Sequence, residues 1–234
     1  MSEGAGNPTR RATVKWLLIG VLIGIVAMGS FVMWDAYRRS QLLATMDFRT
    51  HGPVVPDNVL DTVRNAELQS YHDMGFFRQR AEDAQDAIAL MAPRLAFAWN
   101  FSLGPYRIKA STVDETLDFA LQRGYLTLDS ERSSKYNEVI PFFVMQPSLN
   151  DWEASVLLEY LKQRHPELRK MTWEQIAADP TAIAKLYSGY MGAGGDWRGW
   201  ESSLEPGAVA KQRLGYDRAT GTYTRVEPTT PAIP

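Results

Sequence analysis

The chain of 234 residues contains no cysteine and only three histidines, His51, His72 and His165. Without cysteine it can form neither disulfides nor thiolate metal sites, and it has no cysteine nucleophile. The histidines are widely spaced, so none of them belongs to a His-Glu-x-x-His zinc pattern. The sequence therefore predicts no metal site and no cofactor.

A strong excess of charge of either sign is also missing. The formal net charge is -2 and the sequence pI is about 6.0. Nothing in this balance resembles the basic footprint of a nucleic-acid-binding protein, so no nucleic-acid partner is expected. With 45% hydrophobic and 22% charged residues, the composition is that of an ordinary globular protein with room for about one domain and an anchor.

One long apolar run is present, at residues 16–34, with the sequence WLLIGVLIGIVAMGSFVMW. A helix of this length spans roughly 28 Å, enough for the hydrocarbon core of a bilayer. Trp16 and Trp34 stand at its ends, where tryptophan anchors a helix at the interface. A cleaved signal peptide is the alternative, but its small-residue site, Ala27-Met-Gly29, would lie inside the run. A retained transmembrane helix is expected, after a cytoplasmic tail at residues 1–15.

The basic residues around this run favour one orientation. Arg10, Arg11 and Lys15 precede it, whereas Arg38 and Arg39 follow it. By the positive-inside rule the N-terminus then lies in the cytoplasm. The sequence thus predicts a single-pass protein whose C-terminal domain faces the periplasm from the bacterial inner membrane, or the outside of a cell with one membrane.

The rest of the chain is expected to be all-α, with a juxtamembrane stalk and helix at residues 35–75, a helical domain at residues 76–216 and a flexible tail at residues 217–234. Proline and glycine mark the stalk, and Asp57 is expected to cap its helix. The best strand candidate is residues 139–145.

Further helix boundaries follow from capping residues and from proline. The helix that begins near Phe76 should restart at Pro93, and Gly124 should end the helix opened by the capping box Thr112-Val-Asp-Glu115. Other helix starts are expected at Asn150 or Asp151, at the capping box Thr172-Trp-Glu-Gln175, at Asp179-Pro180 and at Pro206.

Residues 100–112, NFSLGPYRIKAST, contain a Ser-x-Gly-x-x-x-Ile core followed by Ser-Thr. This pattern resembles the loop after the catalytic helix in lysozyme-like lytic transglycosylases. The later Ala184-Lys-Leu-Tyr187-Ser188-Gly189 is similar to the Ala-x-x-Tyr-Asn-x-Gly motif of that family, and the resemblance covers roughly residues 88–216. It implies a lysozyme-like helical domain after the transmembrane helix.

The resemblance also implies a groove that binds peptidoglycan glycan strands. Its residues here would be Ser102, Tyr106, Arg107, Tyr187 and Ser188. Arg107 stands where the family has glutamine, and Ser188 where it has asparagine. An arginine in the groove could pair with a muropeptide carboxylate.

The catalytic acid of the family is missing from this stretch. No Asp or Glu occurs between Asp86 and Asp114, and Asn100, or Trp99 in another alignment, takes the place of the acid. Cleavage of a glycosidic bond needs a carboxylic acid to protonate the leaving oxygen.

Three carboxylates elsewhere remain candidates for this acid: Asp114, Glu115 and Glu138. Each also has a simpler role as a helix cap or a solvated charge. Any carboxylate within about 6 Å of Ser102 and Tyr187 would restore catalysis, because general acids act at short range.

The sequence thus favours a membrane-anchored pseudoenzyme that binds or organises peptidoglycan, plausibly within an envelope-spanning apparatus whose proteins would be further partners. One alternative is an active lytic transglycosylase or muramidase that uses a non-standard acid such as Glu115. The other is a structural module that docks proteins through residues 190–200.

Overall fold

The computed structural model describes residues 8–45, 49–127, 147–192, 206–217 and 222–223. The chain divides into two compact units, Met1–Ala44 and Thr45–Pro234. Each unit is described by itself.

The first unit is built on one long helix, α1 (Pro8–Thr45). Its segment Val14–Asp35 is long and apolar enough to cross a membrane, which agrees with the predicted span. The helix continues for ten residues beyond Asp35, into the segment that was expected to form the juxtamembrane stalk. The reason is local, because residues 36–45 contain no proline or glycine that would stop a helix.

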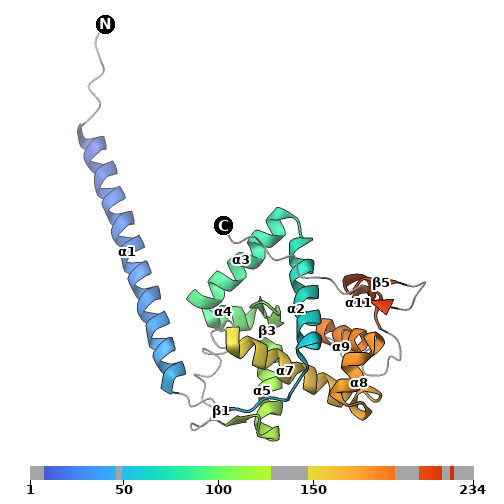
Figure 1. The fold of residues 1–234 in the computed structure, drawn as a ribbon. Helices are drawn as coiled ribbons and strands as arrows, with labels where there is room; N and C mark the ends of the chain where they lie inside the picture. The colour runs from blue at the N-terminus through green and yellow to red at the C-terminus, as the bar shows by residue number, and fades with distance from the viewer. Residues whose placement is uncertain (1–7, 46–48, 128–146, 193–205, 218–221, 224–234) are drawn as a thin grey trace. The chain divides into compact units, whose positions relative to one another are not determined.

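The second unit is mostly helical, with three antiparallel pairs of two-residue strands (Figure 1). Strand β1 pairs with β4, β2 with β3, and β5 with β6. Its elements in chain order are β1 (Arg49–Thr50), α2 (Asp57–His72), α3 (Phe76–Met91), α4 (Pro93–Ala98), β2 (Ser102–Leu103), β3 (Ile108–Lys109), α5 (Ala110–Arg123), β4 (Leu126–Thr127), α7 (Pro147–Arg164), η1 (Leu168–Lys170), α8 (Trp173–Ala178), α9 (Pro180–Gly192), α11 (Ala208–Arg213), β5 (Tyr216–Asp217) and β6 (Thr222–Tyr223).

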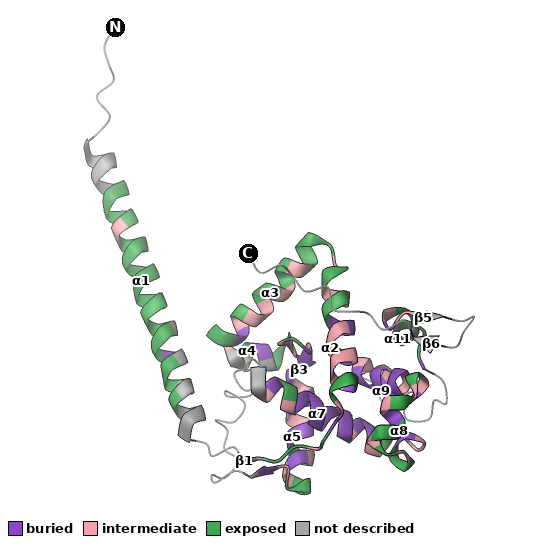
Figure 2. Cartoon of the chain, in the orientation of Figure 1, coloured by how far each residue is buried: buried purple, intermediate pink, exposed green. Residues whose placement is uncertain are grey.

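Helix α7 is the most deeply buried element of this unit (Figure 2). All residues from 153 to 159 are buried, as is typical of a helix surrounded by others. Helices α2, α5 and α9 pack against α7. The side chains of the candidate site therefore lie at the edge of the core. There α2, α3, α9 and α11 approach the β2–β3 hairpin.

Helix α2 belongs to this core and not to a stalk. Its residues Val59, Val63 and Ala66 are buried in the same hydrophobic cluster as α7. The predicted domain start at residue 76 is therefore too late, and the compact unit begins at Thr45. The buried apolar face of α2 is the reason that this helix belongs to the domain, because an apolar stripe on a helix needs a partner that covers it.

Several predicted helix boundaries are confirmed. Helix α3 ends at Met91 and α4 begins at Pro93, and Gly124 ends α5 with a left-handed φ of 70°. Thr172 and Gln175 form the expected capping box of α8. The Asp179 side chain accepts a hydrogen bond from the backbone N–H of Thr181 in the first turn of α9, at 2.8 Å.

Other boundaries differ from the prediction. Helix α2 begins at Asp57, which is therefore not its cap, and α7 begins at Pro147, three residues before Asn150. Helix α11 begins at Ala208 and not at Pro206. The expected strand at residues 139–145 lies outside the described residues. Of the expected flexible tail, Asp217 and Thr222–Tyr223 are described, and they lie in the β5–β6 pair.

The capping box predicted at Thr112 is wrong, because α5 already begins at Ala110. Its N-cap residue, Lys109, makes no side-chain hydrogen bond to the helix. The carbonyl Oδ1 of Asn100 instead accepts a hydrogen bond from the backbone N–H of Ser111, at 3.0 Å. A residue from before the hairpin thus satisfies one of the free amides at the start of α5.

Candidate functional site

The segment 102–109 forms the hairpin β2–β3, with Ser102 paired to Lys109 and Leu103 to Ile108. Two residues of its turn adopt left-handed backbone conformations, Gly104 at φ 69° and Arg107 at φ 50°. Glycine takes this conformation at little cost, but for arginine it costs about 1–2 kcal/mol. Contacts of the Arg107 side chain must offset that cost.

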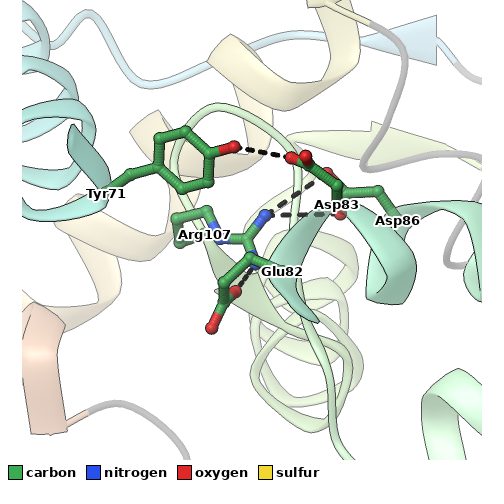
Figure 3. A network of polar contacts seen from close by, with 5 residues as sticks. All are labelled: Tyr71, Glu82, Asp83, Asp86 and Arg107. Atoms are coloured by element: carbon green, nitrogen blue, oxygen red, sulfur yellow. Dashed lines mark hydrogen bonds and ion pairs between the residues drawn. The ribbon is translucent and has the colours of Figure 1, made fainter. Parts of the chain in front are cut away.

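Those contacts come from α3 (Figure 3). The Arg107 guanidinium forms ion pairs with Glu82 and with Asp86, the latter at 3.3 Å, and its side chain is only 14% exposed. Nearby, the Tyr71 hydroxyl donates a hydrogen bond of 2.6 Å to Asp83. Burial raises the pKa of Asp86 to about 6, and the charge of Asp83 adds to this effect.

Arg107 is therefore already neutralised by two carboxylates of its own chain. We expected its guanidinium to be available for a muropeptide carboxylate. The structure instead places it as a tie between the hairpin and α3, so the predicted pairing does not fit its surroundings.

A carboxyl that the sequence did not single out lies beside this hairpin. Glu67, on α2, accepts a hydrogen bond of 2.6 Å from the Tyr187 hydroxyl and another of 3.2 Å from Arg213 Nη1. Arg213 Nη1 also donates to the Tyr187 oxygen, at 3.1 Å, so the three side chains contact one another. They come from α2, α9 and α11.

Two opposing effects act on the pKa of Glu67. The residue is only 9% exposed, and burial raises the pKa of its carboxyl above the ordinary value. The hydrogen bond from Tyr187 and the charges of Arg213 and Arg107 lower it by less. Burial thus favours the neutral form of this carboxyl, as it does in many general acids, whereas its three partners favour the ionised form.

Glu67 lines a cavity of about 210 Å³ together with Ser102, Arg107, Tyr190 and Arg213. Two of the predicted groove residues, Ser102 and Arg107, thus line the same cavity as this carboxyl. Although no carboxyl precedes Ser102 closely in the sequence, a carboxyl of α2 lines the same cavity as Ser102.

The other predicted groove residues occupy different positions. Tyr106 is 1% exposed and Tyr187 is fully buried, so neither ring can stack on a sugar. The Ser188 hydroxyl donates to the carbonyl oxygen of Ala184 at 2.8 Å and accepts from the backbone N–H of Gly207 at 2.9 Å. Tyr187 therefore affects the cavity through its hydrogen bond to Glu67. Ser188 instead connects α9 to the start of α11.

The carboxylates predicted as replacement acids are not near Glu67 in the described part of the chain. Glu115 contacts the Tyr160 hydroxyl and pairs with Arg164 at 3.3 Å. Neither Glu115 nor Asp114 lines the described cavities around Glu67. Glu138 lies outside the described residues. Asn100, at the predicted position of the lost acid, accepts a hydrogen bond from a backbone N–H at the start of α5.

Sequence reasoning missed Glu67, Tyr71 and Arg213. One signal was present for Glu67, which follows Val63 by four residues and therefore lies on the same face of the helix. A carboxylate on an apolar face is rarely buried without a partner. Nothing local indicated that its partners would be Tyr187 and Arg213.

Comparisons of the chain with protein-family models, with curated proteins and with solved structures find no match. The geometry around Glu67 is therefore the basis for a functional proposal.

Proposed function

We propose that this chain is a membrane-anchored lytic transglycosylase that cleaves peptidoglycan glycan strands, with Glu67 as its general acid. The observation that carries the proposal is a buried carboxyl with a raised pKa, in an open cavity beside the hairpin that resembles the groove loop of lytic transglycosylases. In the orientation favoured by the basic residues, the cavity would face the periplasm. A role within an envelope-spanning apparatus is part of the same proposal.

The protonated Glu67 would donate its proton to the glycosidic oxygen as the bond from that oxygen to the anomeric carbon breaks. The carboxylate formed in this step would be stabilised by the Tyr187 hydroxyl and by Arg213, which already contact it. It would then take the proton from the hydroxyl oxygen that attacks the anomeric carbon. Glu67 ends the cycle protonated, as it began.

The source of the attacking hydroxyl separates two reaction types. Most glycoside hydrolases use a second carboxylate to activate water or to attack the sugar. The other carboxylates that line the central cavity or adjoin it are Glu82, Asp83 and Asp86, and each is already bound by Arg107 or Tyr71. If Glu67 is the general acid and these three carboxylates stay bound to Arg107 and Tyr71, no second carboxylate of these cavities is left to activate water. Attack by a hydroxyl of the sugar itself, which is transglycosylation, is then favoured.

The test is to incubate the full chain, in detergent, with purified sacculi and to measure soluble muropeptides. We expect release from the wild type and at least a hundredfold slower release from Glu67→Gln, because removing a general acid costs about 10²–10⁴ in rate. Release should also slow as the pH rises through the raised pKa of Glu67, because the acid is then ionised.

Glu115→Gln is the matched control, since Glu115 contacts Tyr160 and Arg164 and does not line the cavity. It should release muropeptides as fast as the wild type. Equal release from wild type and Glu67→Gln would refute the assignment. Products heavier by one water than the transglycosylation products would show a muramidase instead.

One observation favours a second function, the binding of peptidoglycan without cleavage. Arg213 and Tyr187 both stabilise the ionised form of Glu67, and an ionised carboxyl has no proton to give. Under this alternative the protein would pellet with sacculi and release nothing at any pH.

A further inference from the structure

Three adjoining cavities follow helix α2, and their order rests on the residues that they share. The central cavity shares Glu67, Tyr71 and Arg107 with a cavity of about 320 Å³. It shares Ser70, Met74 and Arg213 with another, of about 420 Å³. The two outer cavities have no lining residue in common, so each adjoins the central cavity through a different set of residues.

The first outer cavity is called the acidic arm, and its charged lining residues are Glu67, Asp83, Asp86 and Arg107. Asp86 pairs with Arg107 and Asp83 pairs with Arg80, so the one guanidinium that lines this arm is already bound. A negatively charged substituent placed in this arm would meet like charges at short range, which is unfavourable.

The second outer cavity is called the basic arm, and its charged lining residues are Arg78, Arg213 and Asp73. Gln69, Ser70 and Gln212 add neutral polar groups. Arg78 lies in the first turn of α3, is exposed, and has no ion-pair partner among the described residues. Its guanidinium is thus available to a ligand, unlike that of Arg107.

Resting on the proposed function, we propose that the glycan strand lies across α2 in one orientation, with the sugar that bears the anionic stem peptide in the basic arm and an unsubstituted sugar in the acidic arm. The assignment rests on Arg78, whose guanidinium is available in the basic arm, and on the lack of such a guanidinium among the residues that line the acidic arm, because Arg213 and Arg107 are already bound to carboxylates. The reverse placement would bring the anionic substituent against Asp83 and Asp86. Arg78 is then a specificity-determining residue for anionic, peptide-substituted strands.

The test compares two glycans in binding to the full chain, in detergent, carrying Glu67→Gln so that nothing is cleaved. One glycan is a soluble peptidoglycan strand that retains its stem peptides, and the other is an uncharged chitooligosaccharide of similar length. Adding Arg78→Gln should weaken binding of the peptidoglycan strand about fivefold, as one charge-assisted contact would. Binding of the neutral oligosaccharide should change little.

Arg169→Gln is the matched control, because it removes one exposed positive charge on η1, away from the described cavities. It should leave both affinities unchanged. If Arg78→Gln and Arg169→Gln weaken binding of the peptidoglycan strand equally, the effect depends only on the net charge of the protein. That result would overturn the proposal. An Arg78→Gln effect of the same size on both glycans would overturn it too.

Failure of this inference is distinguishable from failure of the proposed function. A wild-type protein that releases nothing from sacculi, but whose binding depends on Arg78, would refute the cleavage and support the orientation. If release needs Glu67 but Arg78→Gln binds the strand as the wild type does, the cleavage is supported and the orientation is refuted.

Discussion

At the scale of single residues, the core contains a carboxyl other than Glu67 whose surroundings disfavour its charge. Glu153, on α7, is fully buried and hydrogen-bonds the Thr116 hydroxyl of α5. Its second oxygen, Oε2, has no hydrogen-bond partner among the described residues. Burial raises the pKa of Glu153 to about 8, and the hydrogen bond to Thr116 offsets only part of this.

This pKa predicts a dependence of stability on pH. Between its ordinary pKa of 4.5 and about 8, Glu153 keeps a proton in the folded state that the unfolded state loses. The free energy of unfolding should therefore fall as the pH rises through this window, by up to about 1.4 kcal/mol per pH unit. Glu153→Gln cannot ionise, so it should flatten the curve and be more stable than the wild type at pH 8. Denaturant unfolding of the full chain at several pH values measures this.

The control for this prediction is Glu174→Gln, on a fully exposed carboxylate at the start of α8. Its pKa is lowered by hydrogen bonds to its own backbone N–H and to Thr172, so it is ionised throughout the window in both states. The control should keep the slope of the wild type. Parallel curves for wild type and Glu153→Gln would show that Glu153 does not titrate in this range.

At the scale of elements, the successful predictions rest on residues that act on their immediate neighbours. Pro93 and Gly124 act through their own backbone angles, and Thr172 caps α8 from the adjacent position. The box at Thr112 failed, and Asn100, eleven residues before Ser111 in the sequence, supplies an acceptor to the start of α5 instead. Such a contact depends on how the hairpin folds, which no local pattern records.

Gly124 offers a direct test of one of these local rules. Its φ of 70° lies in the left-handed region, and no atom outside its neighbours lies within 4 Å of an added Cβ. Gly124→Ala should therefore cost about 1 kcal/mol through backbone strain alone. Gly192→Ala, at the end of α9, also adds a Cβ in open space but without a positive φ, and should be neutral or slightly stabilising. Thermal unfolding of the two variants compares them, and an equal loss would exclude strain as the cause.

At the scale of the whole molecule, the candidate site joins segments that are far apart in the sequence. Glu67 and Tyr187 are separated by 120 residues, and Glu67 and Arg213 by 146. The sequence motifs indicated the hairpin with Ser102 and Arg107, because those residues lie within one short loop. Glu67, the proposed acid, lies before the region of resemblance, on the helix that the sequence analysis grouped with the stalk. Only the packing of α2 against the core brings it to the loop.

The orientation predicted for the chain rests on a small excess of basic residues before the apolar segment, and it can be measured directly. Because the chain has no cysteine, single cysteines can be introduced without background. Gln122→Cys places a thiol at an exposed position of the second unit, and Ser2→Cys places one before the span. In intact spheroplasts a membrane-impermeant maleimide should label Gln122→Cys alone, and detergent should then expose Ser2→Cys. The reverse pattern would place the Glu67 cavity in the cytoplasm, away from peptidoglycan, and would exclude the proposed substrate.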